Sequence, residues 1–335
     1  MAIIEATDLV KTYQSRSGTV RALDGLSLSV PEGTVQGLLG PNGAGKTTTV
    51  KVLNTLIRPT SGSAHVAGVD VLADPQGVRR LIGASGQYAA VDEHLTGFEN
   101  LLMVGRLYHL GAKRAKARAS ELIEAFGLTE AAHRPVKGFS GGMRRRIDLA
   151  GALVIKPRIL FLDEPTTGLD PRSRLSLWEI IEDLVAQGTT VLLTTQYLEE
   201  ADRLADDISV IDQGRVIAEG TADELKAQVG GHRIEVVLAH PEDRSVAVEV
   251  LQEHGSGEVR VTSNTELAVA VEQGPVQLER ALAALSERRI PLHDIGMRRP
   301  TLDDVFLTLT GHAAESTDDD GTDSDARPAD HVAAN

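Results

Sequence analysis

The sequence predicts an α/β fold in which helices cover a mostly parallel, buried sheet. Over the first 230 residues, short β-rich runs alternate with longer helical patterns, and the runs are almost wholly apolar. Such alternation implies parallel strands that are joined by crossover helices and covered on both faces. Residues 96–152 are helical only, and strands mix with helices after about residue 231. We therefore expect an α/β core with an inserted helical subdomain and a small C-terminal α+β appendage.

Three strand–helix pairs support the predicted core. They are VQGLLG (35–40) before a helix from about Lys46, ILFLDE (159–164) before a helix from about Pro171, and TTVLLTT (189–195) before a helix from Tyr197. The hairpin-like run DQGRVIAEG (212–220) and a helix that starts near Thr221 close this part of the chain. The first domain is thus expected to span residues 1–230, with the helical subdomain at about 96–152.

The C-terminal region has the expected elements of a separate small domain at 231–311. They are strands at RIEVVL (233–238) and ELAVAVE (266–272), a helix at 275–288, further strand at 290–298, and the segment TLDDVFLTLTG (301–311). In the last segment Thr301 suits an N-cap and Asp304 the acid of a capping box. Residues 312–335 are rich in carboxylates and poor in apolar side chains, which predicts a disordered acidic tail.

The composition excludes several classes of function. A formal net charge of −14 opposes binding to nucleic-acid backbones. The absence of cysteine excludes disulfides and thiolate metal sites. No stretch approaches the roughly 18 apolar residues of a spanning helix, and the N-terminus lacks the pattern of a signal peptide. We expect no nucleic-acid partner, and any role at a membrane must come through another protein.

The segment GPNGAGKT at residues 40–47 matches the P-loop pattern G-x(4)-G-K-[ST]. It follows an expected strand and opens an expected helix, which is the context that this motif requires. The glycines let backbone N–H groups surround phosphate oxygens, and the helix N-terminus adds its dipole. Lys46 would reach the β- and γ-phosphates, and Thr47 would bind Mg²⁺. The alternative is a glycine-rich turn without a ligand.

The run RILFLDEP (158–165) is an apolar strand that ends in two carboxylates. Asp163 suits a magnesium partner, either directly or through water. Glu164 is placed to polarise the attacking water as a general base. An ordinary strand-to-helix turn is the alternative, but the P-loop earlier in the chain favours the catalytic interpretation.

The run FSGGMRRRIDLAGAL (139–153) predicts a second anion site. Ser140 suits an N-cap, two glycines expose the backbone, and a helix N-terminus follows. Two phosphate sites in a chain with one P-loop make sense if two copies face each other. A capped helix without a ligand is the alternative, and the run Arg144–Arg146 is interpreted as a solvated or acid-paired face.

These motifs together resemble the nucleotide-binding subunit of ABC transporters, a family of P-loop NTPases. The landmarks of that family follow in order over residues 5–230. They are Tyr13 in VKTYQ with Val20 as its neighbour at adenine, the Walker A loop at 40–48, the Q-loop glutamine Gln87, the signature at 139–143, the Walker B strand at 158–164 and the D-loop at Gly168–Asp170.

The resemblance implies ATP and Mg²⁺ as cofactors and assigns residues to them. Catalytic roles fall on Glu164, Gln196 and Lys46. The implied ATP-binding residues are Tyr13, Val20, Gly40, Pro41, Asn42, Gly43, Ala44, Gly45, Lys46, Thr47, Thr48, Gln87, Ser140, Gly141, Gly142 and Asp170. The implied magnesium-binding residues are Thr47, Gln87 and Asp163.

Two departures from the usual family pattern indicate a subgroup. Met143 stands in the signature where glutamine is usual, and Gln196 stands at the switch position where most members have histidine. With GMRRR, QYLEEAD (196–202) and TLDDVFLTLTG, they resemble the daunorubicin-resistance subgroup of drug and antibiotic exporters. The match covers about 311 of the 335 residues and leaves out the acidic tail. It implies an ATPase that drives drug export, with import as the alternative because the ATPase chemistry is the same.

The resemblance also implies partners and a location. Two copies would form a head-to-tail homodimer, with each ATP between the Walker loops of one copy and Ser140–Gly142 of the other. The segment after Gln87 and the helices of 96–135 would receive a short cytoplasmic helix of an integral-membrane permease. The chain would then act as a peripheral protein on the cytoplasmic side of the cell membrane. Three other classes fit less well, namely DNA-repair ABC ATPases with a long coiled coil, ribosome-acting ABC proteins with two domains, and P-loop kinases or GTPases without the signature.

Overall fold

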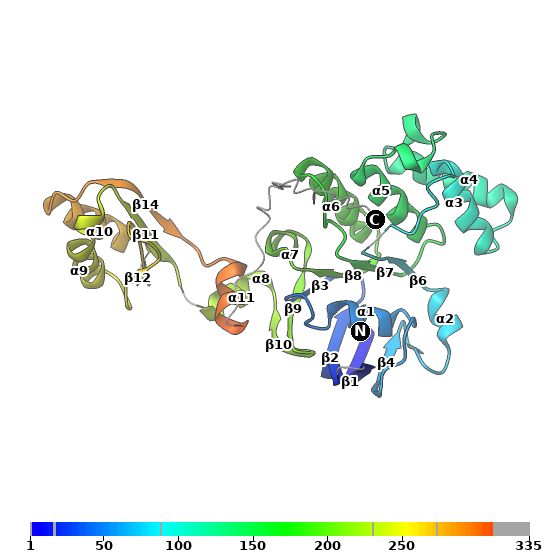
Figure 1. The fold of residues 1–335 in the computed structure, drawn as a ribbon, viewed down its shortest axis with the longest axis horizontal. Helices are drawn as coiled ribbons and strands as arrows, with labels where there is room; N and C mark the ends of the chain where they lie inside the picture. The colour runs from blue at the N-terminus through cyan, green and yellow to red at the C-terminus, as the bar shows by residue number, and fades with distance from the viewer. Residues whose placement is uncertain (1, 16–17, 88, 230, 273, 311–335) are drawn as a thin grey trace, which may run out of the picture.

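The computed structural model describes residues 2–15, 18–87, 89–229, 231–272 and 274–310. The acidic tail that the sequence predicts at 312–335 lies outside these residues. Figure 1 shows one large part that is built of three layers and a smaller part at the far left, to which the chain passes after α8. Within the described residues, no helix is both long and apolar enough to cross a bilayer.

A six-stranded sheet forms the centre of the large part, in the order β10-β9-β3-β8-β7-β6. Its strands are β3 (Val35–Leu39), β6 (Ile82–Ser85), β7 (Ile159–Asp163), β8 (Thr190–Thr195), β9 (Asp207–Asp212) and β10 (Arg215–Gly220). All neighbours pair in parallel except the hairpin of β9 and β10. Every residue of β3, β7 and β8 is buried, which confirms the predicted covered, mostly parallel sheet.

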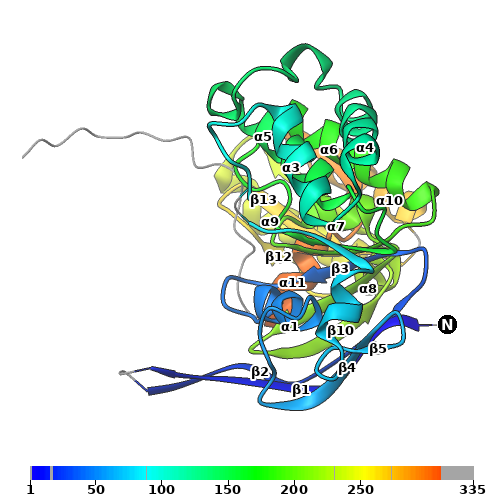
Figure 2. The ribbon, with the colours of Figure 1, turned by 90° about the vertical axis from the view of Figure 1, so that its right-hand side faces the viewer.

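A second, antiparallel sheet lies below the first and was not expected from the sequence. Its order is β2-β1-β4-β5, and its strands are β1 (Ala2–Ser15), β2 (Gly18–Pro31), β4 (Ser61–Val66) and β5 (Val69–Asp70). Helix α1 (Lys46–Leu53) lies between the two sheets (Figure 2). Leu9, Val50 and Phe161 belong to the apolar core that joins these layers. The short helix α2 (Pro75–Arg79) leads from β5 into β6.

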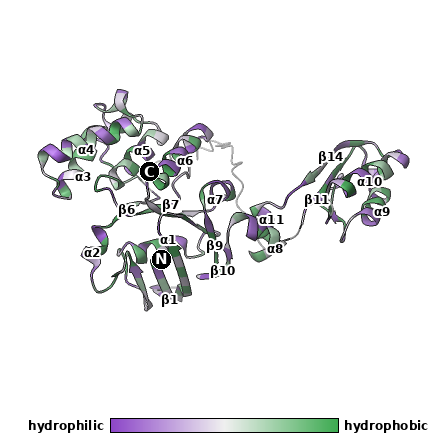
Figure 3. Ribbon diagram, turned by 180° about the vertical axis from the view of Figure 1, so that it is seen from behind, coloured by the Kyte–Doolittle hydropathy of each residue, from purple (hydrophilic) through white to green (hydrophobic). Residues whose placement is uncertain are grey.

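Helices cover the other face of the central sheet. They are α5 (Gly141–Ala152), α6 (Pro171–Ala186) and α7 (Leu198–Leu204). Helices α3 (Gly97–Leu107) and α4 (Ala112–Ala125) pack on α5 farther from the sheet, and the 3₁₀ turns η1 (Thr129–Ala131) and η2 (Val136–Gly138) lie between α4 and α5 in the chain. A capping box starts α3, because Thr96 and Glu99 exchange side chain-to-backbone hydrogen bonds. Helices α3 and α4 carry both hydrophilic and hydrophobic segments, as helices packed on one side do (Figure 3). The predicted helical insertion is therefore present.

The smaller part has its own core and its own sheet, in the order β12-β13-β11-β14. Its elements are β11 (Arg233–Leu238), η3 (Pro241–Asp243), α9 (Arg244–His254), β12 (Arg260–Val261), β13 (Glu266–Ala270), α10 (Gly274–Glu287) and β14 (Leu292–Arg298). All strand pairs are antiparallel. Buried side chains of β11, β13, α9 and α10 form one cluster. The α+β character is as predicted, whereas α9 was not expected.

The last helix, α11 (Leu302–Thr310), packs on the large part and not on the smaller sheet's core. Its buried side chains Leu302, Val305 and Phe306 join a cluster with α7, β9 and α8 (Ala222–Val229). Burial of each such side chain contributes about 1.5–3 kcal/mol. The predicted capping box at its start is present, with Thr301 and Asp304 bonded to each other's backbone N–H. In the chain, the smaller part thus lies between α8 and α11, and both helices pack in one cluster with α7 and β9 of the large part.

Candidate nucleotide-binding and catalytic site

The loop from Gly40 to Gly45 joins β3 to α1 and is held close to its neighbours. A Cβ at position 40 would lie 2.3 Å from the carbonyl oxygen of Ile211. Gly45 is the N-cap of α1 with φ of 115°, a conformation that side chains other than glycine rarely adopt. No side chain caps α1 by a hydrogen bond, and the first turn of the helix contains no acidic residue. The loop therefore has the form of an anion site.

Lys46 lies inside this loop with only 4% of its surface exposed. Its Nζ donates to the carbonyl oxygens of Gly40 at 2.6 Å and Pro41 at 3.1 Å. It also lies 3.9 Å from Oε1 of Glu164. The buried ammonium is thus held by carbonyl groups of the loop, close to the residue that follows β7.

Asp163 ends β7 and faces the first turn of α1. Its Oδ1 accepts from the hydroxyls of Thr47 at 3.1 Å and Thr194 at 2.7 Å. Neighbouring ligands of an octahedral Mg²⁺ with bonds of 2.0–2.1 Å lie about 2.9 Å apart. The Thr47 and Asp163 oxygens are therefore spaced as two such ligands would be. Thr194 was not singled out from the sequence, although it is one of two threonines that follow the apolar centre of β8.

Glu164 follows directly and has a left-handed backbone, with φ of 49°. Such a conformation costs about 1–3 kcal/mol for a residue other than glycine and is often found at active sites. Its N–H is held by both the carbonyl and the hydroxyl oxygen of Thr194, each at 3.1 Å. Its Oε2 accepts from Gln87 at 3.3 Å and from the Thr167 hydroxyl at 3.4 Å. Thr194 of β8 thus holds the backbone of Glu164, whereas Gln87 and Thr167 hold its carboxylate.

Gln87 therefore contacts the expected general base and not the expected magnesium residue Asp163. Its role as a magnesium ligand stays a prediction. Gln196 follows β8 and is half-buried. Among the side chains that the structure describes, none donates a hydrogen bond to its buried Oε1. An amide oxygen in that state suits a donor from outside the chain, such as a water molecule.

The signature segment begins α5, and its parts differ in exposure. Ser140 is exposed and caps the helix by accepting from the N–H of Met143 at 3.3 Å. Gly142 is buried, and a Cβ there would lie 2.4 Å from Oγ of Ser173. The glycine thus permits close packing against the start of α6. There Asp170 is the N-cap and accepts from the N–H of Ser173 at 2.9 Å. The hydroxyl of Ser173 also donates to Asp170. Its hydrogen bond has the larger effect and, together with that of the N–H, holds the pKa of Asp170 below its ordinary value.

The sequence predicted a solvated or acid-paired face for Arg144–Arg146. Arg145 is buried and paired with an acid, so the second of these alternatives is correct for it. Its Nε donates to the carbonyl oxygen of Pro165 at 2.7 Å, and its Nη1 donates to that of Gly86. Asp148 lies 3.6 Å away as its ion-pair partner. Burial lowers the pKa of the guanidinium and raises that of the Asp148 carboxyl. Arg145 therefore joins the signature helix to the segments on either side of the site.

Tyr13 and Val20 are opposite each other in the pairing of β1 with β2. They are 40% and 58% exposed. The ammonium of Lys11 lies 5.2 Å from the centre of the Tyr13 ring. The neighbour relation that the sequence predicted for this pair is correct, and both side chains have surface free for a flat ring.

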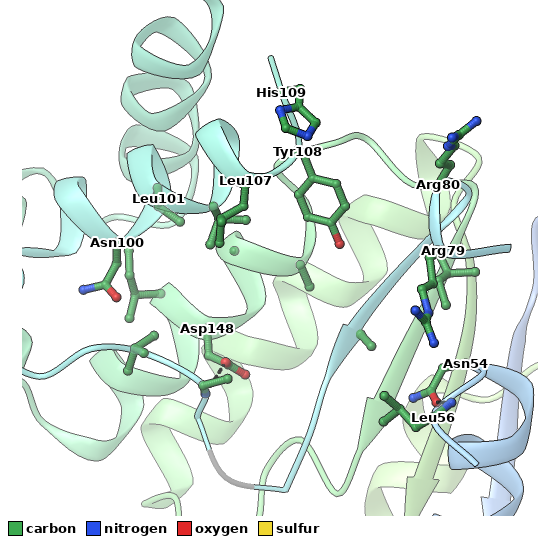
Figure 4. A pocket seen from close by; sticks show the side chains of 18 of the residues that line it. Asn54, Leu56, Arg79, Arg80, Asn100, Leu101, Leu107, Tyr108, His109 and Asp148 are labelled. Atoms are coloured by element: carbon green, nitrogen blue, oxygen red, sulfur yellow. Dashed lines mark hydrogen bonds between the residues drawn. The ribbon is translucent and has the colours of Figure 1, made fainter. Parts of the chain in front are cut away.

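A groove of about 630 Å³ lies between the helical subdomain and the α/β core. Figure 4 shows Leu107 and Tyr108, at the end of α3, facing Arg79 and Arg80 across it. Leu56 is also exposed in this groove. Exposed apolar side chains and arginines together are typical of a protein interface.

Known proteins match both parts of the chain. The ABC transporter family matches residues 23–167, and the family of "ATP-binding protein DrrA1-3-like, C-terminal domain" matches residues 220–310. The chain is 56% identical to the daunorubicin resistance ATP-binding protein DrrA2 of Streptomyces coeruleorubidus, over 92% of this chain and 96% of that protein. It is 48% identical to the doxorubicin resistance ATP-binding protein DrrA of Mycobacterium tuberculosis, over 91% and 93%. Identity to the linearmycin resistance ATP-binding protein LnrL of Bacillus subtilis is 35%, over 92% and 98%.

Solved structures match the large part. One is the dimeric ATP-binding cassette MJ0796 bound to ADP and Pi, with a TM-score of 0.61 and 25% identity. It covers 65% of this chain and 98% of that chain. Another is an ATP-binding subunit of an ABC transporter, with a TM-score of 0.60, 30% identity, and coverage of 68% and 92%.

Proposed function

Because this chain belongs to the ATP-binding proteins of ABC transporters, we propose that its ATP hydrolysis drives export of a drug or antibiotic through a separate membrane-spanning permease. The observation that supports the drug substrate is the 56% identity to a daunorubicin resistance protein along almost the whole of both chains. The match of residues 220–310 to the C-terminal domain of that group extends the likeness beyond the ATPase domain.

The residues at the start of α1 and at the end of β7 support separate roles in hydrolysis. Lys46 binds the β- and γ-phosphates after it exchanges its carbonyl partners in the loop for phosphate oxygens. Thr47 and Asp163 would hold Mg²⁺, and the bound ion would neutralise developing charge on the phosphates. Glu164 accepts a proton from the attacking water, and Gln196 orients that water or the γ-phosphate. The distances of 3.1 Å from the Thr47 hydroxyl to Asp163 and of 3.9 Å from the Lys46 ammonium to Glu164 are what support this assignment.

A complete site in this proposal needs two chains. Ser140 and Gly141 are exposed at the N-terminus of α5, so their N–H groups can reach a phosphate on a second copy. Asp170 is exposed at the start of α6 and can face the same partner. A solved relative of this fold is dimeric. Two copies would therefore bind two ATP molecules at their interface.

The groove beside Tyr108 is the proposed contact with the permease. A short helix of the permease that rests there would contact both the helical subdomain and the α/β core. Closure of the dimer would then move the permease. This contact would hold the chain at the cytoplasmic side of the cell membrane.

Efflux measurements test the proposed transport. Cells that make this chain together with a membrane-spanning permease that binds it should accumulate less daunorubicin than cells that make the permease alone. The same cells with Glu164→Gln should accumulate as much as the permease-only cells. Higher accumulation with the wild-type chain would indicate import and contradict the proposal.

Gln196→Ala tests the proposed switch residue. We expect turnover to fall by an amount equal to about 1–3 kcal/mol, the usual worth of a hydrogen bond to a charged group. Gln196→His should stay active because it restores a donor of similar reach. The wild-type rate should show no ionisation near pH 6.5 from this position, since an amide does not titrate there, whereas the histidine variant should. A wild-type rate for Gln196→Ala, with binding measured separately, would remove this side chain from the chemistry.

A further inference from the structure

A carboxyl group that the proposed mechanism does not use is buried next to the site. Glu200 lies on α7 and is 0% exposed. Its Oε1 accepts a hydrogen bond of 3.0 Å from Nε1 of Trp178, which is buried on α6. A buried carboxyl is costly unless its surroundings use it, and an apolar side chain of the same size would often be more stable there. The position of Glu200 therefore calls for a role other than packing.

The second oxygen of this carboxyl faces the loop after Glu164. Among the described side chains, neither Glu200 Oε2 nor the buried hydroxyl of Thr166 has a hydrogen-bond partner. Burial raises the pKa of Glu200, and the hydrogen bond from Trp178 opposes that shift. A hydroxyl can donate to a carboxyl oxygen, so a small shift of this loop would satisfy both groups.

Helices α6 and α7 are also joined on either side of this hydrogen bond. The Arg174 guanidinium lies 5.2 Å from the ring centre of Tyr197, just before α7. The Arg203 guanidinium lies 5.1 Å from the Trp178 ring and donates to Glu182 at 2.9 Å. Contacts therefore run along the interface from the first turn of α6 to its third. Side-chain contacts thus connect the two helices along much of their length.

Each of these helices carries a residue of the proposed site at its start. Gln196 comes two residues before α7, and Asp170 caps α6. Thr166 lies in the loop between Glu164 and Asp170. Glu200 thus lies on the helix that follows Gln196 and is hydrogen-bonded to the helix that Asp170 caps.

We propose that Glu200 is a positioning residue that links Gln196 to Asp170 through Trp178, so that contact of Gln196 with the γ-phosphate also sets the dimer-facing loop. This inference rests on the proposed roles of Gln196 and Asp170. It adds a route between them within one chain. It also makes Trp178 a reporter, because the sequence contains one tryptophan.

Fluorescence of Trp178 tests the route in the full-length protein with Glu164→Gln, which should bind ATP without turning it over. ATP should change the emission, whereas ADP should not, because the route begins at the γ-phosphate. Adding Gln196→Ala should abolish the ATP-specific change. An equal change with ADP, or a change that survives Gln196→Ala, would overturn the inference.

Turnover of Glu200 variants tests the residue itself. Glu200→Met keeps the length of the side chain but forms no hydrogen bond to Trp178, and we expect kcat to fall about tenfold, the factor that 1.4 kcal/mol represents, with KM for ATP nearly unchanged. Glu200→Gln keeps an acceptor for Trp178 and a donor for Thr166, so it should recover most of the rate. Asp202→Asn is the matched control and should match wild type, because Asp202 is an exposed carboxyl on the same helix that pairs with Lys226 of α8 and not with α6.

Two outcomes would overturn the role of Glu200. One is a folded Glu200→Met protein with wild-type kcat and the same ATP-specific emission change. The other is a Glu200→Gln protein as slow as Glu200→Met, because hydrogen bonding would then not explain the effect. Should Glu200→Met not fold, Glu200→Gln and the emission data decide the matter. If Glu164→Gln itself turned over ATP normally, the general-base role in the proposed function would fail instead, so the two failures are distinguishable.

Discussion

Replacing Glu164 by glutamine should leave ATP bound while hydrolysis falls by about 10²–10⁴-fold, the usual contribution of a general base. The amide has the same shape and can still accept from Gln87 and Thr167, which now hold the carboxylate at 3.3 and 3.4 Å. It cannot take a proton from water at neutral pH. The loss should therefore appear in kcat and not in the affinity for ATP.

The measurement pairs phosphate release with nucleotide binding on the same preparation. Glu124→Gln is a suitable control, since Glu124 is an exposed carboxyl on α4, away from β7. It should hydrolyse ATP as the wild type does. Turnover of Glu164→Gln within about threefold of wild type would be too small a loss for a general base and would remove Glu164 from that role.

Mixing two inactive variants should restore hydrolysis if each site uses two chains. Lys46→Ala removes the buried ammonium of one half-site, and Ser140→Arg places a bulky cation at the exposed helix start of the other. Each variant alone should be nearly inactive. In a mixed dimer one site has both Lys46 and Ser140 intact, so equal mixing should recover about a quarter of the wild-type sites.

The control is a mixture of Lys46→Ala with a chain that carries both substitutions, which offers no intact site in any pairing. Heterodimers should be detected directly, for example by pull-down through a tag on one chain. A mixture as inactive as its components, with heterodimers present, would contradict a site shared between chains. Activity should also rise faster than linearly with protein concentration, because the chain must dimerise first.

The elements of the core could be predicted because their signals are local. The strands β3, β7 and β8 are apolar from end to end, and Gly45, Asp170 and Thr301 each stand at a helix start as expected. Caps and periodicity depend on neighbours within a few residues, so one sequence suffices to recognise them. The same holds for the P-loop and for the carboxylates at the end of β7.

Other elements gave weak local signals or mixed ones. Strands β1 and β2 alternate buried and exposed residues around several register shifts, so no long apolar run marks their sheet. Helix α9 begins without a side-chain cap hydrogen bond. Both become stable through packing against other elements, which the pattern of their own residues does not reveal.

By itself, the sequence determined the order of the elements, the identity of the phosphate-binding loop and the residues around it that carry charge. Only the tertiary structure decided which distant side chains share one place. It brought Thr194 to Asp163, turned Gln87 towards Glu164, and buried Arg145 between two loops. It also joined Glu200 to Trp178. Contacts of this kind form where strands from separate parts of the chain end at one sheet edge, so their partners are set by packing and not by spacing.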